Sequence, residues 1–413
     1  MAVDVLIVGG GHAGAQTATA LRNLKFSGSI TLVTDEAELP YERPPLSKEY
    51  LAGARPFERL LLRPPSFWSE RGIRIETGRR ITAIDPARRE AFTDDGITIQ
   101  YGTLVWAAGG RARRLACSGE ELRGVHTIRT RADIDAIKAR LADVRDVVIA
   151  GGGYIGLEAA AVLRKLDKNV TLVEMLPRIL SRVAGPEISE FLASEHRRHG
   201  VDVRTEVAVE CLEGSEDIAG VRLTNGERLR ADLAIVGIGI IPNVEPLLAA
   251  GAIGGNGVHV DEHCRTSLPH VYAIGDCAAH VNAFAGGERI RLESVQNAND
   301  QGTTVAKILA GQDARYHALP WFWSDQYDLK LQTAGVALGY DTTILRGDTA
   351  ARSFSVAYLR RGQLIAVDCV NAMREYVQAR KIIVEGARPD VRALADASIP
   401  LKDVPMRCTV GSS

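Results

Sequence analysis

The chain has 413 residues, which is longer than one hydrophobic core usually supports, so we expect two or three domains. Hydrophobic residues make up 46% of the chain and charged residues 24%, and the formal net charge is -1. This balance excludes a general attraction to nucleic acid or to an anionic membrane. No apolar run approaches the roughly 18 residues that cross a bilayer. The apolar run at residues 3–8 is too short for a signal peptide, so we expect a cytoplasmic protein.

A glycine-rich loop opens the chain, between a strand expected over residues 5–8 and a helix expected over 15–24. Its pattern is G-x-G-x-x-G, with Gly9, Gly11 and Gly14 at the fixed positions and Ala13 at a variable one. Glycines there permit a tight turn and let a pyrophosphate approach the positive end of the helix. The next strand, over 29–34, ends at Asp35, near the distance at which an acid binds ribose hydroxyls. One such loop alone could be an ordinary glycine-rich turn, and His12 is expected only to fill it.

The same arrangement recurs after a second apolar strand at residues 147–150. Its loop residues are Gly151, Gly153, Ile155 and Gly156. A helix is expected over 157–166, and a strand over 169–173 ends at Glu174. Two complete strand–loop–helix–strand units argue against a chance match and predict two dinucleotide sites. Glu174 can accept hydrogen bonds from a ribose 2′-OH and repels a 2′-phosphate, and no arginine follows it directly, so NADH is favoured over NADPH.

Three further segments indicate that the first site holds a flavin. A buried strand at 104–110 ends in small residues, where a flat cofactor could lie close. A second strand within 266–276 ends in Gly-Asp, which points the Asp276 carboxylate toward polar hydroxyls. Residues 292–309 form a helical stretch whose positive end could stabilise negative charge on a reduced flavin ring.

Three stretches resemble the oxygenase-coupled NADH–ferredoxin reductases, which are flavoproteins of the glutathione-reductase-like fold. They are PPLSK at 44–48, GGGYIGLE at 151–158 and WFWSDQY at 321–327, and the likeness runs from about residue 3 to 404. The resemblance implies FAD contacts at Ala13, Asp35, Lys48, Ile81, Arg129, Asp276 and Val295. It implies NADH contacts at Gly153, Ile155, Gly156 and Glu174.

The resemblance also implies a charged pair, Lys48 and Glu158, beside the flavin and the nicotinamide. One of Trp321 and Trp323 would shield the flavin edge, and the alternative is that both are ordinary core aromatics. Of the two, Trp323 is the candidate cofactor contact.

The expected fold is α/β, with two Rossmann-like three-layer domains, one for FAD and one for NAD, and a C-terminal α+β domain with an antiparallel sheet. The FAD domain is expected over 1–112 and 245–318, the NAD domain over 113–244 and the last domain over 319–413. Strands are expected in the last domain at 329–334, 342–346, 353–359 and 363–370. In the resembled family this domain covers the flavin and contributes to ferredoxin docking.

Six cysteines are scattered without a CxxC pair, and none lies in residues 38–51. Disulfide reductases of this fold carry their cysteine pair near that region, so relay through a disulfide is excluded. Electrons are therefore expected to leave the flavin directly, to a one-electron carrier. Cys277 is expected to be a small buried residue, and the histidines show no spacing typical of a metal site.

The expected partner is a small [2Fe–2S] ferredoxin, which would dock transiently on a basic rim. Candidates for the rim are Arg63, Arg374, Arg380 and Lys381, although any one of them could be an ordinary solvated charge. Thr303 and Gln332 stand where relatives in the family are basic, which suggests either docking that depends less on charge or a different ferredoxin.

The leading functional hypothesis is a reductase whose ferredoxin feeds a haem-thiolate monooxygenase. The second is the reductase component of an aromatic-ring dioxygenase. The third is a redox signalling flavoprotein resembling apoptosis-inducing factor.

Overall fold

A computed structural model describes residues 2–407 of the chain. The chain divides into two compact units. The first contains the chain up to Arg43, Pro56–Arg111 and Ile240–Pro320, and the second contains Pro44–Arg55, Ala112–Gly239 and the chain from Trp321 onward. The division groups the C-terminal sheet with the second nucleotide fold, and it groups Pro44–Arg55 with them, so the expected division into three domains stays a prediction.

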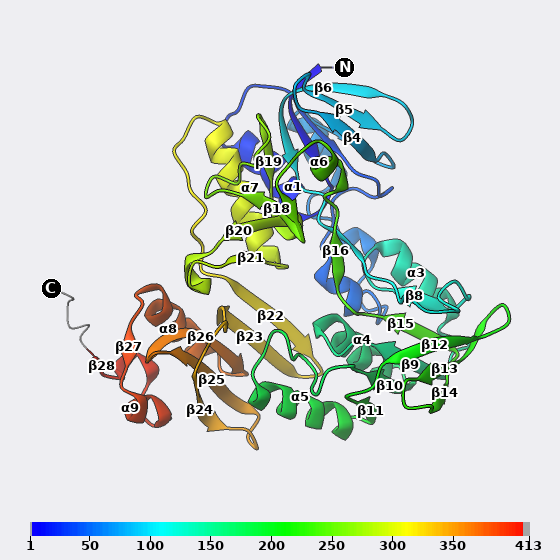
Figure 1. Ribbon diagram of the computed structural model, residues 1–413, viewed down its shortest axis with the longest axis vertical. Coiled ribbons are helices and arrows are strands. Elements are labelled where there is room, and N and C mark those ends of the chain that lie inside the picture. The colour runs from blue at the N-terminus through cyan, green and yellow to red at the C-terminus, as the bar shows by residue number, and fades with distance from the viewer. Residues whose placement is uncertain (1, 408–413) are drawn as a thin grey trace. The chain divides into compact units, whose positions relative to one another are not determined.

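The first unit is built on a mostly parallel sheet centred on β1, Ala2–Val8 (Figure 1). Strands β2 and β6 pair with β1 in parallel, β3 pairs with β2, and β5 and β4 extend the other side in antiparallel pairing. Strand β19 pairs in parallel with β6. The bounds are β2 Ile30–Val33, β3 Ile73–Glu76, β4 Ile81–Asp85, β5 Glu90–Thr93, β6 Thr98–Trp106 and β19 Val271–Ala273.

Strand β1 is buried on both faces, as a central parallel strand must be. Leu6 belongs to a core on one side of the sheet, whereas Val5 and Ile7 belong to a core on the other side. Helix α1, His12–Asn23, and helix α7, Val295–Leu309, supply the second of these cores. A Cβ at Gly302 would lie 2.8 Å from the Ala13 carbonyl oxygen, so only glycine lets the two helices approach this closely.

The second unit begins with a five-stranded parallel sheet of order β11-β10-β9-β15-β8, centred on β9, Asp146–Ala150. Its other strands are β8 Val125–Thr127, β10 Asn169–Val173, β11 Val201–Arg204 and β15 Leu233–Val236. Its helices are α3 Arg131–Arg140, α4 Tyr154–Lys165 and α5 Pro186–Arg198, and a small antiparallel sheet comprises β12 Val209–Gly214, β13 Ile218–Leu223 and β14 Arg228–Arg230. The expected Rossmann-like pattern is therefore present in both units.

A five-stranded antiparallel sheet of order β22-β23-β26-β25-β24 completes the second unit. Its strands are β22 Trp321–Gln326, β23 Leu329–Gly335, β24 Thr342–Asp348, β25 Ser353–Arg360 and β26 Gln363–Val370, and helices α8 Met373–Val384 and α9 Val391–Ala395 follow. Four of these strands match the expected runs to within two residues. Strand β22 was not expected as a strand.

Short elements connect these sheets and helices. They are η1 Pro44–Ser47, η2 Phe57–Leu60, η3 Gly275–Cys277, η4 Ala283–Ala285, η5 Leu401–Asp403, α2 Pro65–Glu70, α6 Glu245–Ala249, β7 Gly110–Ala112, β16 Ile240–Pro242, β17 Gly254–Gly255, β18 Gly257–Val260, β20 Ala278–Val281, β21 Arg289–Arg291, β27 Arg388–Pro389 and β28 Met406–Arg407. In the described part of the chain, no helix combines the length and the apolar character that crossing a membrane requires.

Candidate functional site

The two glycine loops are built alike. Gly9 has φ +115° and a Cβ there would lie 2.2 Å from the Ala107 carbonyl oxygen. Gly151 has φ +112° and a Cβ there would lie 2.4 Å from the Gly237 carbonyl oxygen. Both the backbone conformation and the close approach exclude a side chain, so each loop requires glycine as its first residue.

Each loop also leaves the start of its helix open. Gly11 and Gly153 are the N-cap residues of α1 and α4, and a Cβ at either position would meet no atom within 4 Å among the described residues. Among those residues, no side chain caps either helix. The N-cap position of each helix therefore leaves room for a ligand at the positive end of the helix dipole, which fits a pyrophosphate in each loop. Gly14 and Gly156 follow on the first turns, and Ile155 is exposed beside Gly156.

The second loop carries the expected acid in a fixed orientation. Glu174 Oε2 accepts a hydrogen bond from the Gly152 N–H, and Oε1 accepts one from the Leu176 N–H, both at 2.8 Å. Each carboxylate oxygen keeps a further lone pair for a ribose hydroxyl. The residues present thus fit the adenosine ribose of a pyridine nucleotide.

The sheet register places a different residue at the equivalent point of the first loop. Val8 pairs with Val33 in the first sheet, as Ala150 pairs with Val173 in the second. The residue that follows is Thr34 in the first unit and Glu174 in the second. Glycines in the loops confirm the equivalence, because a Cβ at Gly10 would contact Thr34 and one at Gly152 would contact Glu174.

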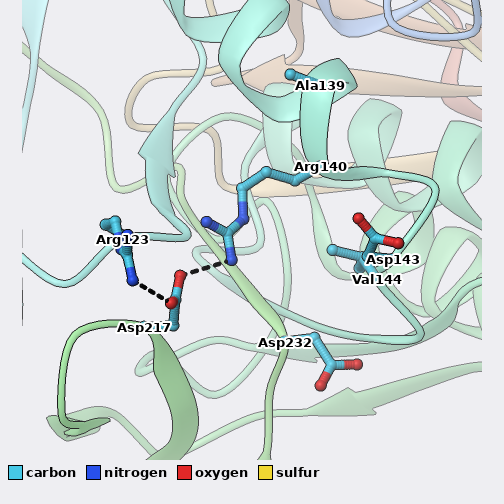
Figure 2. A pocket seen from close by; sticks show the side chains of 7 residues that line it. All are labelled: Arg123, Ala139, Arg140, Asp143, Val144, Asp217 and Asp232. Carbon is cyan, nitrogen blue, oxygen red and sulfur yellow. Dashed lines mark hydrogen bonds and ion pairs between the residues drawn. The ribbon is translucent and has the colours of Figure 1, made fainter.

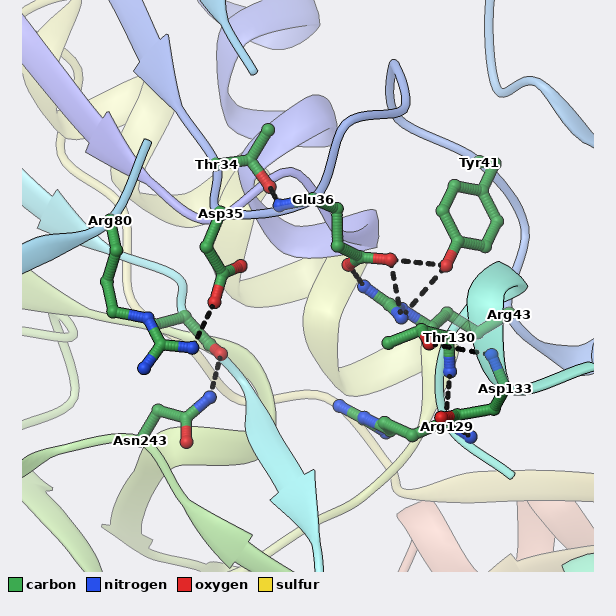
Figure 3. Close-up of polar contacts among 11 residues, drawn as sticks. Thr34, Asp35, Glu36, Tyr41, Arg43, Arg80, Arg129, Thr130, Asp133 and Asn243 are labelled. Atoms are coloured by element: carbon green, nitrogen blue, oxygen red, sulfur yellow. Dashed lines mark hydrogen bonds and ion pairs between the residues drawn. The ribbon is translucent and has the colours of Figure 1, made fainter. Parts of the chain in front are cut away.

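Asp35 lies one residue beyond this point, and its side chain is about half exposed. It pairs with Arg80 at 3.1 Å, whereas the next acid, Glu36, accepts a hydrogen bond from the Tyr41 hydroxyl at 2.5 Å and forms an ion pair with Arg43 (Figure 3). No pattern in the sequence indicates the Glu36–Arg43 pair, since charged residues are common in loops.

The remaining expected FAD residues divide between the two units. Asp276 lies in η3 directly after β19, Val295 is the first residue of α7 and Ile81 begins β4, all in the first unit. Arg129 belongs to the second unit, where its backbone N–H donates to Asp133 Oδ2 at 2.9 Å just before α3 (Figure 3). Lys48 also belongs to the second unit.

Lys48 and Glu158 form a buried ion pair, with 2.8 Å between Lys48 Nζ and Glu158 Oε2 and with side chains 13% and 4% exposed. Two serines complete the site, since Ser47 Oγ donates to Oε2 at 2.6 Å and Ser324 Oγ donates to Oε1 at 2.7 Å. A buried carboxylate is stable only when its oxygens are satisfied in this way. Sequence reasoning missed both serines, although Ser47 directly precedes Lys48.

Trp323 and Trp321 lie on one face of β22, because side chains alternate along a strand. Their rings are 5.6 Å apart, and the Arg380 guanidinium lies over the Trp321 ring at 5.8 Å. Both indoles are half-buried, so neither is a fully enclosed core residue.

Among the described cysteines, those at 211, 264, 277 and 369 are buried. Burial raises the pKa of the Cys277 thiol to about 12, so this thiol is not poised for redox chemistry. Cys408 lies outside the described residues.

A charged hollow of about 340 Å³ lies beside α3 (Figure 2). Arg123 pairs with Asp217 at 2.7 Å and with Glu216 at 2.8 Å, and Arg140 pairs with Asp217 at 2.9 Å, so two carboxylates offset the two guanidinium charges. None of the expected cofactor residues is among the described residues that line it, and we assign it no role.

Comparisons with known proteins define the class. Residues 3–302 match the pyridine nucleotide-disulphide oxidoreductase family, and residues 321–405 match a reductase C-terminal family. The chain therefore belongs to the pyridine nucleotide-disulphide oxidoreductase family. It is an oxidoreductase that uses FAD and NAD(P)H.

Two relatives and one solved structure are similar to nearly the whole chain. The chain is 57% identical to the 5,5'-dehydrodivanillate O-demethylase ferredoxin reductase subunit of Sphingobium sp., over 97% of this chain and 98% of that one. It is 41% identical to putidaredoxin reductase of Pseudomonas putida, over 97% and 96% of the two chains. Its structure matches that of putidaredoxin reductase in a covalent complex with putidaredoxin, with a TM-score of 0.93, 40% identity and 97% of each chain covered.

Proposed function

We propose that this chain is an NADH-dependent ferredoxin reductase. One NADH and two oxidised [2Fe–2S] ferredoxins would give NAD⁺, two reduced ferredoxins and one proton. The observation that carries the proposal is the buried ion pair between Lys48, which follows η1, and Glu158, which lies on the helix that the second glycine loop opens. Its support from comparison is that the relatives named above are ferredoxin and putidaredoxin reductases.

The cofactor assignments follow from the two loops and the family resemblance. We assign FAD to Gly9, Gly11, Ala13, Gly14, Asp35, Lys48, Ile81, Arg129, Asp276, Val295 and Trp323. We assign NADH to Gly151, Gly153, Ile155, Gly156 and Glu174. Bound FAD supplies the conversion of a two-electron donor's hydride into single electrons.

Lys48 and Glu158 act through charge. The Lys48 ammonium is almost enclosed, so its field is weakly screened by solvent, and it would stabilise negative charge that develops beside it. Glu158 holds the ammonium in one position, because both of its oxygens are already bound by hydroxyl donors. We propose both as the catalytic residues of hydride transfer.

Glu174 supports NADH as the donor in preference to NADPH. Its carboxylate is held by the backbone N–H groups of Gly152 and Leu176 and cannot easily turn away. A 2′-phosphate brought to this position would meet a fixed negative charge.

We propose that the ferredoxin docks at helix α8 and receives the electrons there. Arg374 and Lys381 are exposed on it, and Arg380 lies over the rings of Trp321 and Tyr376. Exposed Met373 and Val377 stand on the same helix, so it offers apolar contact together with positive charge. Arg63 belongs to the first unit and stays a separate candidate. An acidic ferredoxin is complementary to such a rim.

We further propose a cytoplasmic location. On the resemblance of residues 321–327, we also propose that the ferredoxin feeds a haem-thiolate monooxygenase. The named relatives are reductases of electron-transfer systems, which does not favour the signalling alternative.

The steady-state test supplies NADH, cytochrome c and either putidaredoxin or the ferredoxin of an aromatic-ring dioxygenase. We expect cytochrome c reduction that depends on added ferredoxin and that is faster with NADH than with NADPH. Faster turnover with the dioxygenase ferredoxin would favour the second hypothesis. Reduction that is independent of either ferredoxin would contradict the proposal.

A further inference from the structure

Strand β22 turns two polar side chains toward the nucleotide fold of its own unit. Ser324 and Gln326 alternate with Trp323 and Asp325 along the strand, and they are only 1% and 2% exposed. Ser324 contacts Glu158 on α4, and Gln326 contacts His196 on α5, which is itself 1% exposed. Fully buried polar groups are costly unless they are paired, so this cluster requires an explanation.

The contacts form one continuous chain of hydrogen bonds. Ser324 Oγ lies 2.7 Å from Glu158 Oε1, and Gln326 Nε2 lies 3.1 Å from Ser324 Oγ. Gln326 Oε1 lies 2.8 Å from His196 Nε2, and the Tyr327 hydroxyl lies 3.1 Å from His196 Nδ1. Each intermediate group thus has one neighbour on each side.

The Lys48–Glu158 ion pair fixes the direction of these hydrogen bonds. Because Lys48 and Ser47 both donate to Glu158 Oε2, the glutamate is an anion, and its Oε1 can only accept. Ser324 must then donate to Glu158, so its oxygen must accept from the Gln326 amide. The Gln326 carbonyl oxygen consequently accepts from His196 Nε2–H, and Nδ1 accepts from the Tyr327 hydroxyl. Every donor in the chain points toward the carboxylate.

His196 fits this role as a neutral ring. Burial lowers the pKa of His196 to about 4, so the ring carries a single N–H at neutral pH, and the chain requires that N–H on Nε2. A chain of aligned donors stabilises the charge at its end more than one hydroxyl alone.

We propose that Ser324 is a positioning residue for the reaction, which acts with Gln326 and His196 to hold the Glu158 carboxylate in line with Lys48. The inference rests on the proposed function, because it assigns Ser324 a role only through the Lys48–Glu158 pair. Ser324 itself is not a catalytic residue, since its described contacts are with Glu158 and Gln326.

The test is a double-mutant cycle with S324A, E158Q and the double variant, read by anaerobic stopped-flow reduction of bound FAD by NADH. We expect S324A to slow reduction roughly 10- to 100-fold with an unchanged NADH dissociation constant, because small misplacements of reacting groups are costly. S324T keeps the hydroxyl and should restore the rate. S355A, which alters a buried serine of the same sheet, is the matched control and should leave the rate unchanged.

In the E158Q background, S324A should cause no further loss, because the residue through which Ser324 acts is already altered. Additive losses, or a failure of S324T to restore the rate, would overturn the inference while leaving the proposed function intact. The wild type, S324A, E158Q and the double variant are also unfolded in urea, a measurement that needs no NADH. The shifts of their urea midpoints should be non-additive. A wild-type holoprotein that NADH fails to reduce would instead overturn the proposed function.

Discussion

Thr34 and Glu174 occupy the same position in the two nucleotide folds, directly after the last residue of the second strand that pairs with the first. One loop therefore presents a hydroxyl where the other presents a carboxylate. The neighbouring acids of the first loop are engaged elsewhere, Asp35 with Arg80 and Glu36 with Arg43. The two loops share their glycines but differ in the group at this equivalent position, a hydroxyl in the first and a carboxylate in the second.

Replacement of Glu174 tests coenzyme choice. In E174Q the charge is lost while the side-chain shape is kept, so we expect kcat/KM for NADH to fall about 10-fold, the loss of one hydrogen bond to a charged group. The value for NADPH should rise, because repulsion of a 2′-phosphate is removed. D35N is the matched control from the first loop and should leave the NADH-to-NADPH ratio unchanged. An unchanged ratio in E174Q would remove Glu174 from the nucleotide site.

Loss of the Lys48 ammonium should slow hydride transfer. K48M keeps much of the stem and removes the charge, so we expect flavin reduction to slow roughly 100-fold, in the range seen when one electrostatic donor is removed. The variant also leaves Glu158 buried without its ion-pair partner, so its stability is measured in parallel. K402M changes an exposed lysine and serves as the control. A normal reduction rate in K48M would exclude Lys48 from catalysis.

Charge reversal on α8 should separate the two half-reactions. We expect R374E and K381E to raise the KM for ferredoxin about 10-fold at low ionic strength, with a smaller effect as salt screens the rim. Reduction of FAD by NADH should be unaffected. R228E, at an exposed position of strand β14, is the control for a general change of charge. A ferredoxin KM that responds equally to all three variants would argue against α8 as the docking surface.

The raised pKa of Asp368 predicts that the free energy of unfolding depends on pH. Its oxygens accept hydrogen bonds from Thr333 at 2.7 Å and Tyr358 at 2.6 Å, yet burial raises the pKa of this carboxyl from 3.8 to about 6. Because the folded pKa is above the unfolded one, the stabilising contribution is present below about pH 4 and is lost as the pH rises through 6.

Asparagine cannot ionise, so the stability of D368N relative to the wild type should rise by about 1.4 kcal/mol between pH 5 and pH 8, the part of the effect of a pKa shift from 3.8 to about 6 that develops in this range. Urea unfolding at the two pH values measures this change. Comparing the variant with the wild type at each pH cancels the opposite contributions of His196 and His280, in both of which burial lowers the pKa to about 4. D348N, in an exposed position of the same sheet, is the control. If D368N and the wild type differ in free energy of unfolding by the same amount at both pH values, Asp368 does not titrate in this range.

Local patterns were sufficient to predict the two glycine loops, the strands that flank them and four strands of the C-terminal sheet, whereas the Lys48–Glu158 pair was expected only from the family resemblance. Spacing counted from the glycines could not place the first acid, because the connection over residues 24–29 is longer than its counterpart over 166–168. Only the sheet register shows that Thr34 matches Glu174.

Strand β22 shows no alternation of apolar and polar residues, because three aromatic residues precede three polar ones, so a period of two does not predict it. Ser324 and Gln326 share one face of the strand and are buried although both are polar, which their residue types do not predict. The contact of His196 with Gln326 joins residues far apart in the sequence, so no local pattern could have found it.

The most direct test of the central claim is an anaerobic single turnover. FAD-loaded protein is mixed with one equivalent of NADH, and then with two equivalents of oxidised putidaredoxin, while the absorbance of each centre is followed. We predict that two ferredoxins are reduced for each NADH consumed and that the flavin returns to its oxidised spectrum. Protein that NADH reduces but that retains its electrons in the presence of the oxidised ferredoxin would contradict the account.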